Sequence, residues 1–284
     1  MKEEKKLIVN ADDFGLHESI NEAIENAHRQ GILTSTSLVV NGEAFEHAVE
    51  IAKRNRDLGV GLHLTLIGEQ PVALPHRIKS IVDAGGRLYE NHKQLCIKIL
   101  RKEVLLKDII VEIEAQFDKF YKTGFAPTHL DSHRHLHLFP PIFNSIKPVL
   151  QKYNIKRMRY LNIPCFEFNR GNYFKKIMAL FFKCFSLLNK KKYKHQDFFF
   201  GFFDSGHLDK DYLVYLLRKL KPGITEINFH PGKNNQDIRK KYNIWDMHSS
   251  WKYDWEKEFR VLIDDNLKTL IKENKITLVN YSVL

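Results

Sequence analysis

The sequence has few cysteines and no long apolar run, and each shortage argues against a class of protein. Three of the 284 residues are cysteines, and they form no paired motif. A disulfide framework is therefore not expected, and a reducing, cytoplasmic setting is the simplest expectation. No run of eighteen apolar residues occurs, so the sequence predicts no transmembrane helix. The charged residues 1–6 also lack the apolar stretch of a secretory signal.

Acidic residues are scarce between positions 147 and 195, where thirteen Lys or Arg accompany one acid, Glu167. This segment carries a formal charge of +12, so the rest of the chain is close to neutral although the whole protein carries +11. Such a segment attracts nucleic acid, anionic lipid or an anionic substrate, or it is the solvated face of a helix. The solvated face is the more common case and is the one expected here.

Repeats and low-complexity linkers are also absent, so we expect one domain over residues 1–284. Apolar, β-branched runs alternate with amphipathic helical patterns, which predicts an α/β fold with a mostly parallel sheet or barrel covered by helices. The stretch 65–103 is predicted to be a long, mostly irregular excursion. Strands are predicted at 7–9, 37–40, 59–64, 156–160, 225–229 and 276–279, and helices at 18–29, 44–52, 104–121, from 141, 209–220 and 254–273.

Residues 128–137 hold the densest group of polar side chains, with four histidines and Asp131 in ten residues. A strand that runs into a loop is predicted there. In an extended chain His133, His135 and His137 share one face, because side chains alternate. Neutral imidazoles beside a carboxylate are typical of divalent metal sites. Surface histidines, or core histidines that bond backbone carbonyls, are the alternatives.

Further polar residues stand at the ends of other predicted strands. Asp12 and Asp13 follow the first strand, where two adjacent carboxylates are costly, since like charges resist joint ionisation. Capping of the next helix explains only one of them. His63 ends the third strand and His230 ends the strand at 225–229, although a lone histidine in a strand is more often a core residue. The carboxyl ends of barrel strands gather catalytic groups, so we expect these residues to form one site.

The segment 166–203 is a basic, Phe-rich insertion. Apolar residues follow helical spacing over 174–188, and three lysines at 190–192 and an aromatic run at 198–203 come after them. We expect a helix that covers one side of the substrate groove. A basic helix that lies on a membrane surface is the alternative.

Four motifs stand in order along the chain: Asn10-Ala11-Asp12-Asp13-Phe14-Gly15, Gly61-Leu62-His63, Thr128-His129-Leu130-Asp131-Ser132-His133-Arg134-His135-Leu136-His137 and His230-Pro231-Gly232. They resemble the signatures of the YdjC-like carbohydrate deacetylases, over roughly four fifths of the chain. The resemblance implies a distorted, TIM-like (β/α) barrel of about seven parallel strands, with helices outside and long rim loops. It also implies removal of acetyl groups from N-acetylated sugars of the chitooligosaccharide or N-acetylglucosamine type.

The same resemblance implies one divalent metal ion, held by Asp13, His63 and His133. Two histidines and one carboxylate suit Zn²⁺, Fe²⁺, Mn²⁺, Co²⁺ or Ni²⁺, whereas Mg²⁺ prefers oxygen ligands. Members of the family occur with Mg²⁺ as well as Zn²⁺, so the identity of the metal stays open.

The resemblance further implies that Asp12 is the general base and His230 the general acid. We expect His135, His137 and Arg159 to contact the substrate. The expected partner is a small N-acetylated sugar or oligosaccharide, with no nucleic-acid or membrane partner, and a homodimer stays open.

Two other functions stay open from the sequence. A metal-dependent phosphoesterase would hold phosphate with Arg157, Arg159 or nearby lysines, and such enzymes commonly use two metals about 3.5–4 Å apart. A nucleic-acid-binding barrel without catalysis would use the +12 segment and lose affinity as salt rises. The intact motifs favour the deacetylase.

Overall fold

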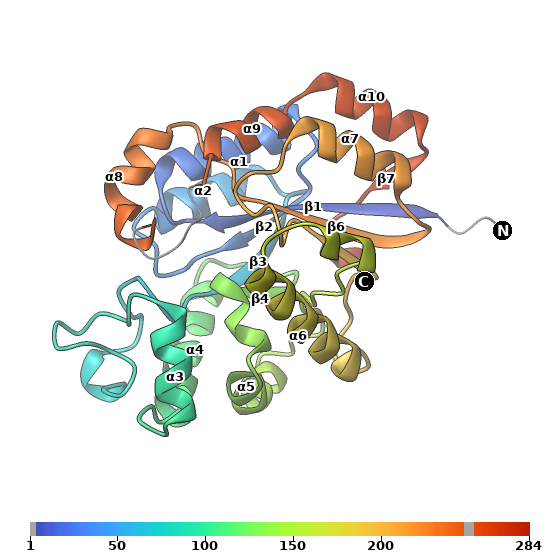
Figure 1. Ribbon diagram of the computed structural model, residues 1–284. Helices are drawn as coiled ribbons and strands as arrows, with labels where there is room; N and C mark the ends of the chain where they lie inside the picture. The colour runs from blue at the N-terminus through green and yellow to red at the C-terminus, as the bar shows by residue number, and fades with distance from the viewer. Residues whose placement is uncertain (1–3, 247–252) are drawn as a thin grey trace.

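A sheet of parallel strands forms the centre of the computed structural model, which describes residues 4–246 and 253–284 (Figure 1). The strands are β1 (Lys5–Phe14), β2 (Ser35–Leu38), β3 (Gly59–Leu64), β4 (Leu130–Ser132), β5 (Phe198–Phe200), β6 (Gly223–Phe229) and β7 (Ile276–Leu278). Their order is β4-β3-β2-β1-β6-β5, and β7 pairs with the first residues of β1. Every pairing between these strands is parallel, so the predicted α/β barrel class is confirmed.

Residues 156–162 connect the two edge strands of this sheet. Isolated bridges link Met158 to Leu130 in β4 and Arg157 to Lys194, shortly before β5. The sheet therefore curves into a distorted barrel that an irregular segment completes. The prediction of a regular strand at 156–160 is wrong. The adjacent strands β4 and β5 are each three residues long and offer this segment little backbone to pair with.

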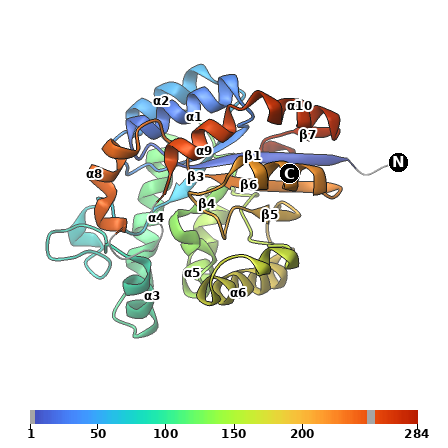
Figure 2. The same cartoon turned by 45° about the horizontal axis from the view of Figure 1, so that its top comes forward.

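Ten α-helices of the described residues surround the barrel (Figures 1 and 2). None of the helices in residues 4–246 and 253–284 is long and apolar enough to cross a membrane. The sequence did not predict α3, which lies in the excursion at 65–103, or α8. The helices are α1 (Glu18–Gln30), α2 (Phe45–Arg54), α3 (His92–Leu100), α4 (Leu106–Tyr121), α5 (Pro140–Lys152), α6 (Tyr173–Asn189), α7 (Lys210–Lys219), α8 (Asn235–Asp246), α9 (Trp255–Leu262) and α10 (Asp265–Glu273).

Two helices, α9 and α10, stand where one was predicted at 254–273. The chain leaves helical geometry after Leu262, and the Asp264 carboxylate accepts a hydrogen bond from the Asn266 backbone N–H. An Asp side chain that bonds the backbone ahead of it favours a new helix start over a continued helix.

The strands turn apolar side chains toward the helices and polar side chains into the barrel. In β1, Val9 and Ala11 belong to the apolar core, whereas Asn10 and Asp12 alternate with them and bond each other inside. The same alternation places His63 of β3 inside, between two leucines of the core. Polar groups therefore collect inside the barrel near the carboxyl ends of its strands.

Candidate metal and catalytic site

A distortion at the end of β1 brings Asp12 and Asp13 to the same site. The register with β2 shifts between Ala11 and Phe14, and Asp13 has a left-handed backbone with φ of 68°. In a regular strand the two carboxylates would point to opposite faces. Here each has an oxygen within 4.8 Å of a ring nitrogen of His63. Left-handed backbone at a residue other than glycine costs about 1–3 kcal/mol and is concentrated at functional sites.

Asp13, His63 and His133 form a compact group of donor atoms. Asp13 Oδ1 lies 3.6 Å from His63 Nε2 and 3.2 Å from His133 Nδ1, and all three side chains are buried. Donor atoms that share a tetrahedral ion at about 2.0–2.2 Å lie roughly 3.4 Å from one another. One carboxylate and two imidazoles at this spacing fit a single divalent metal.

The charges of this group favour a bound cation. Burial alone would raise the pKa of Asp13, but the hydrogen bond and charge of His133 hold it well below its usual range. Burial alone would lower the pKa of His63, yet the charges of Asp131 and Asp12 raise it to about 9. The carboxylates therefore dominate the local potential, and a metal ion would neutralise them.

Asp131 fixes the orientation of His63. Its Oδ1 accepts a hydrogen bond from His63 Nδ1 at 2.8 Å. In the neutral ring that a metal requires, the lone pair is therefore on Nε2, the atom beside Asp13. A carboxylate on the second ring nitrogen is typical of metal-bound histidines. The Ser37 hydroxyl donates to the other oxygen of Asp131 at 2.7 Å. No separate role for Asp131 was predicted from the sequence, although an acid within the His-rich motif was a signal for one.

Arg159 holds the Asp12 carboxylate from inside the barrel. Its Nη1 and Nη2 donate to Asp12 Oδ2 and Oδ1 at 2.9 and 2.8 Å. Amide groups of Asn228 and Asn10 donate to the same carboxylate at 2.9 and 3.0 Å. Contrary to the prediction of a substrate contact, Arg159 is 0% exposed and does not line the pocket. Its double hydrogen bond sets the direction of Asp12 instead.

Loss of the Arg159 guanidinium should destabilise the fold strongly. It pairs with three buried carboxylates, Asp12 at 2.8 Å, Asp131 at 2.7 Å and Glu226 at 2.8 Å. Removing one partner of a buried ion pair costs about 3–5 kcal/mol. We expect Arg159→Met to lower the free energy of unfolding in urea by at least that amount.

Arg157→Met is the matched control for this experiment. Arg157 lies two residues away and donates to backbone carbonyls near the C-terminus. Its loss removes hydrogen bonds worth about 1 kcal/mol each and leaves no buried charge. Equal destabilisation by both substitutions would contradict the role given to Arg159.

His230 follows β6 and faces Asp12. Its Nε2 lies 3.8 Å from Asp12 Oδ2, and its backbone N–H donates to the buried Glu258 at 2.5 Å. Burial lowers the pKa of His230 to about 4, although the charges of Asp12 and Asp13 oppose this. An exposed histidine would titrate at about 6.5. His230 is therefore neutral near pH 7, and a role as acid requires a proton delivered during the reaction.

The His-rich stretch is not extended beyond Ser132, which corrects the prediction that its histidines share one face. His133–Leu138 forms a 3₁₀ turn in which Arg134 and His135 have left-handed backbones, with φ of 55° and 56°. These two residues turn successive side chains in different directions. His133 alone of the three reaches the donor group with Asp13.

The other two histidines of the turn have different surroundings. His137 is buried, with Nδ1 2.6 Å from the Ser132 hydroxyl and Nε2 2.9 Å from the Arg159 carbonyl oxygen. It braces the turn and does not line the pocket, contrary to the predicted substrate contact. His135 does line the pocket, beside three phenylalanine rings.

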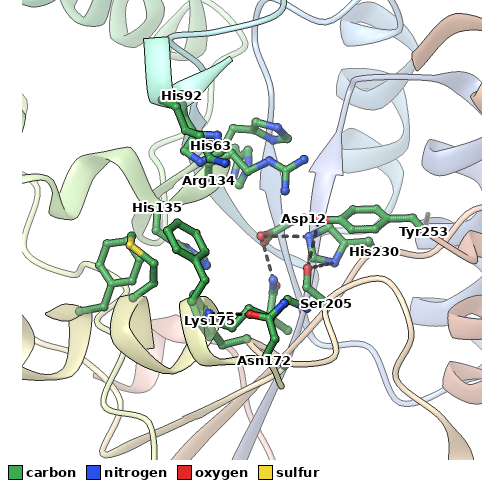
Figure 3. Close-up of a pocket in the computed structure, with 18 residues that line it drawn as sticks. Asp12, His63, His92, Arg134, His135, Asn172, Lys175, Ser205, His230 and Tyr253 are labelled. Carbon is green, nitrogen blue, oxygen red and sulfur yellow. Dashed lines mark hydrogen bonds and ion pairs between the residues drawn. The ribbon is translucent and has the colours of Figure 1, made fainter. Parts of the chain in front are cut away.

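A pocket of about 200 Å³ lies beside these groups (Figure 3). The insertion at 166–203 supplies much of its wall through α6, so this segment lies next to the expected groove. No pattern in the sequence pointed to His92, Ser205 or Tyr253, which come from the excursion and from loops. The lining residues include Asp12, His63, His133, His230, His92, Arg134, His135, Asn172, Phe174, Lys175, Phe182, Ser205 and Tyr253.

The fold and the site together define an α/β barrel protein with a buried carboxylate–histidine group at the carboxyl ends of its strands. The chain belongs to the YdjC-like protein family, whose model matches residues 6–273. The resemblance seen in the four motifs is thereby confirmed.

Individual relatives agree with this membership. A carbohydrate deacetylase of Clostridium beijerinckii is 30% identical over 281 residues, which cover 97% of this chain and 98% of the relative. A chitooligosaccharide deacetylase of Proteus mirabilis is 40% identical over 148 residues, or 51% of this chain and 55% of the relative. A crystal structure from Enterococcus faecalis V583, provisionally named a cellobiose-phosphate cleavage protein, matches with a TM-score of 0.77 and 26% identity. That match covers 99% of this chain and 98% of the other.

Proposed function

We propose that this protein is a metal-dependent carbohydrate deacetylase. Its substrates are N-acetylated sugars of the chitooligosaccharide or N-acetylglucosamine type. The observation that carries the proposal is the buried group of Asp13, His63 and His133, with Asp12 and His230 beside it at one pocket. Relatives that align over nearly the whole chain are named carbohydrate deacetylases, which supports the reaction. Relatives named chitooligosaccharide deacetylases, which align over about half of the chain, support the type of sugar.

Asp13, His63 and His133 would hold the ion, and Zn²⁺ and Mg²⁺ are the candidates. The two imidazoles favour Zn²⁺, because Mg²⁺ prefers oxygen donors. When bound, such an ion polarises the acetyl carbonyl and makes water more acidic. The chain prepares the site by presenting His63 Nε2 through Asp131 and by bending β1 at Asp13.

Amide hydrolysis adds water across the C–N bond, so the attacking water loses a proton and the departing amine gains one. Asp12, fixed by Arg159, accepts the proton from water at Oδ2. This oxygen lies 3.8 Å from His230 Nε2. His230 is neutral at rest, so it takes this proton and passes it to the amine nitrogen. The products are acetate and the free amino sugar.

A two-metal phosphoesterase fits this site less well. A second donor group exists in Asp12, His63 and Asp131, but it shares His63 with the first group. Both of its carboxylates, Asp12 and Asp131, form ion pairs with the Arg159 guanidinium. A guanidinium so close to both oxygens opposes a second cation there by charge repulsion.

Acetate release tests the proposal. The protein, loaded in turn with Zn²⁺ and Mg²⁺, is given N-acetylglucosamine, chitobiose, longer chitooligosaccharides and their phosphate esters. We expect equal amounts of acetate and free amine, about one ion per chain, and loss of activity with a chelator that metal addition reverses. Phosphate release, with two ions per chain and no acetate, would replace the deacetylase by the phosphoesterase.

A further inference from the structure

Helix α6 exposes a continuous apolar stripe on the outside of the barrel. A barrel helix normally turns its apolar side inward and polar side chains outward. The inner side of α6 is indeed buried, through Ala179, Phe182 and Ser186. Its outer side nevertheless carries six large apolar residues that are 39–84% exposed. These residues, called the outer stripe below, are Tyr173, Ile177, Leu180, Phe181, Leu187 and Leu188.

The spacing of these residues makes the stripe one surface. With 3.6 residues per turn, side chains three, four, seven and eight positions apart share a helix face. The stripe follows this pattern over the whole length of α6. Apolar groups gathered on an exposed surface in this way mark an interaction site, whereas single exposed apolar residues need no explanation.

Positive charge borders the outer stripe. The stretch 170–196 contains eight Lys or Arg and no Asp or Glu. Lys176 and Lys183 each precede an outward-facing residue by one position, which places them along one edge of the stripe. Within the described residues neither lysine forms an ion pair with a carboxylate.

More lysines surround a surface hollow beyond the C-terminal end of α6. One acid, Asp197, also lines this hollow. Its carboxylate accepts a hydrogen bond from the Ile224 backbone N–H at 2.7 Å. A group of ammonium donors around a hollow suits anionic oxygens such as those of a phosphate headgroup. The basic residues that line the hollow are Lys156, Lys190, Lys191, Lys192, Lys194 and His195.

We infer that the outer stripe and its bordering lysines dock on an anionic membrane surface. Apolar side chains would enter the boundary between headgroups and acyl chains, while the lysines contact the negative headgroups. The N-terminal turn of α6 also lines the pocket through Phe174, so docking holds the pocket beside the lipid surface. This inference is independent of the deacetylase proposal, because the binding needs no substrate.

A second copy of the chain is a poorer occupant of this surface. In a two-fold contact the same patch faces itself. Because 170–196 contains no acid, such a contact brings lysines near lysines without a counter-charge. Nucleic acid would satisfy the lysines but leave the aliphatic residues of the stripe exposed. An anionic bilayer matches the charge and the apolar side chains together.

Vesicle flotation of the full chain tests this inference. We expect the protein to float at least about tenfold more with vesicles of phosphatidylcholine and phosphatidylglycerol than with phosphatidylcholine alone, and less as salt rises. Two variants, Leu180→Glu/Leu188→Glu and Lys190→Glu/Lys191→Glu/Lys192→Glu, should each lower the bound fraction at least about tenfold. The charge-matched control Lys219→Glu/Lys272→Glu/Lys275→Glu changes exposed lysines at the ends of α7 and α10 and should bind like wild type.

Unfolding temperatures near that of wild type would show that the variants fold. If the leucine variant fails to fold, the variant of the three exposed lysines still decides the matter. Absence of wild-type binding to anionic vesicles overturns the inference. So does equal loss in the control variant. Two results without vesicle binding would assign the surface to another partner. A dimer that Leu180→Glu dissociates would assign it to a second copy of the chain. Salt-sensitive binding to an oligonucleotide would assign it to nucleic acid.

Discussion

Asp13→Ala is expected to lose bound metal and activity together. The metal content should fall from about one ion per chain to near zero, and kcat for acetate release by about 10³-fold or more. Asp13 Oδ1 lies next to both His63 and His133, so its removal takes the central donor from the group. Polarisation by a metal ion is worth several kcal/mol in the transition state, and each 1.36 kcal/mol is a factor of ten in rate.

Metal analysis by mass spectrometry and acetate assays on the same samples would measure both effects. Asp211→Ala, which removes an exposed aspartate from α7, is the control and should match wild type. His133→Ala should behave like Asp13→Ala. Full metal occupancy in either variant would move the ion to Asp12, His63 and Asp131, the second donor group.

The sequence predicted that polar residues at the ends of several strands lie close together, because parallel strands end at one edge. Asp12 and His63 lie near the carboxyl ends of β1 and β3, and His230 directly follows β6. The parallel order of the strands brings these ends together. The alternation of helices and strands likewise predicted a mostly parallel sheet or barrel covered by helices. These features depend on local patterns that a sequence displays directly.

The direction of individual side chains depends on backbone angles that the sequence does not display. Asp13 and His135 have left-handed backbones, and each redirects the side chains around it. An alternating pattern predicts the opposite faces of a regular strand and therefore misses both turns. The burial of Arg159 follows from three carboxylates on three separate strands, whose convergence only the assembled barrel shows. For the same reason a substrate-contacting arginine could not be told from a structural one.

The insertion at 166–203 shows a related limit. Helical spacing predicted α6, and its place beside the pocket fits the expected groove. The same spacing does not tell which apolar side faces the barrel when both sides are apolar. The structure assigns Phe182 to the inside and Leu188 to the outside. The exposed side then requires an explanation of its own.

Asp12→Asn and His230→Ala should each lower kcat by about 10²–10⁴-fold, the usual worth of a general acid or base. Bound metal should stay near one ion per chain, because neither side chain belongs to the Asp13 group. Asparagine keeps the shape of Asp12 and still accepts one hydrogen bond from Arg159, so the barrel should remain folded. Acetate assays, metal analysis and thermal unfolding on each variant measure these three outcomes.

The double variant Asp12→Asn/His230→Ala distinguishes a shared proton path from two separate roles. If Asp12 passes its proton to His230 across the 3.8 Å gap, loss of either residue interrupts the same path. The double variant should then be no slower than the slower single variant, because residues that act as one unit are not additive. Additive losses would show that Asp12 and His230 act separately.

The pH profile of kcat gives a second criterion for the relay. With its pKa lowered to about 4, His230 is neutral at rest, so kcat should not fall as pH rises from about 5 to 8. A tenfold fall per pH unit above about 6.5, absent in His230→Ala, would mean that His230 starts the reaction protonated and that no relay is needed.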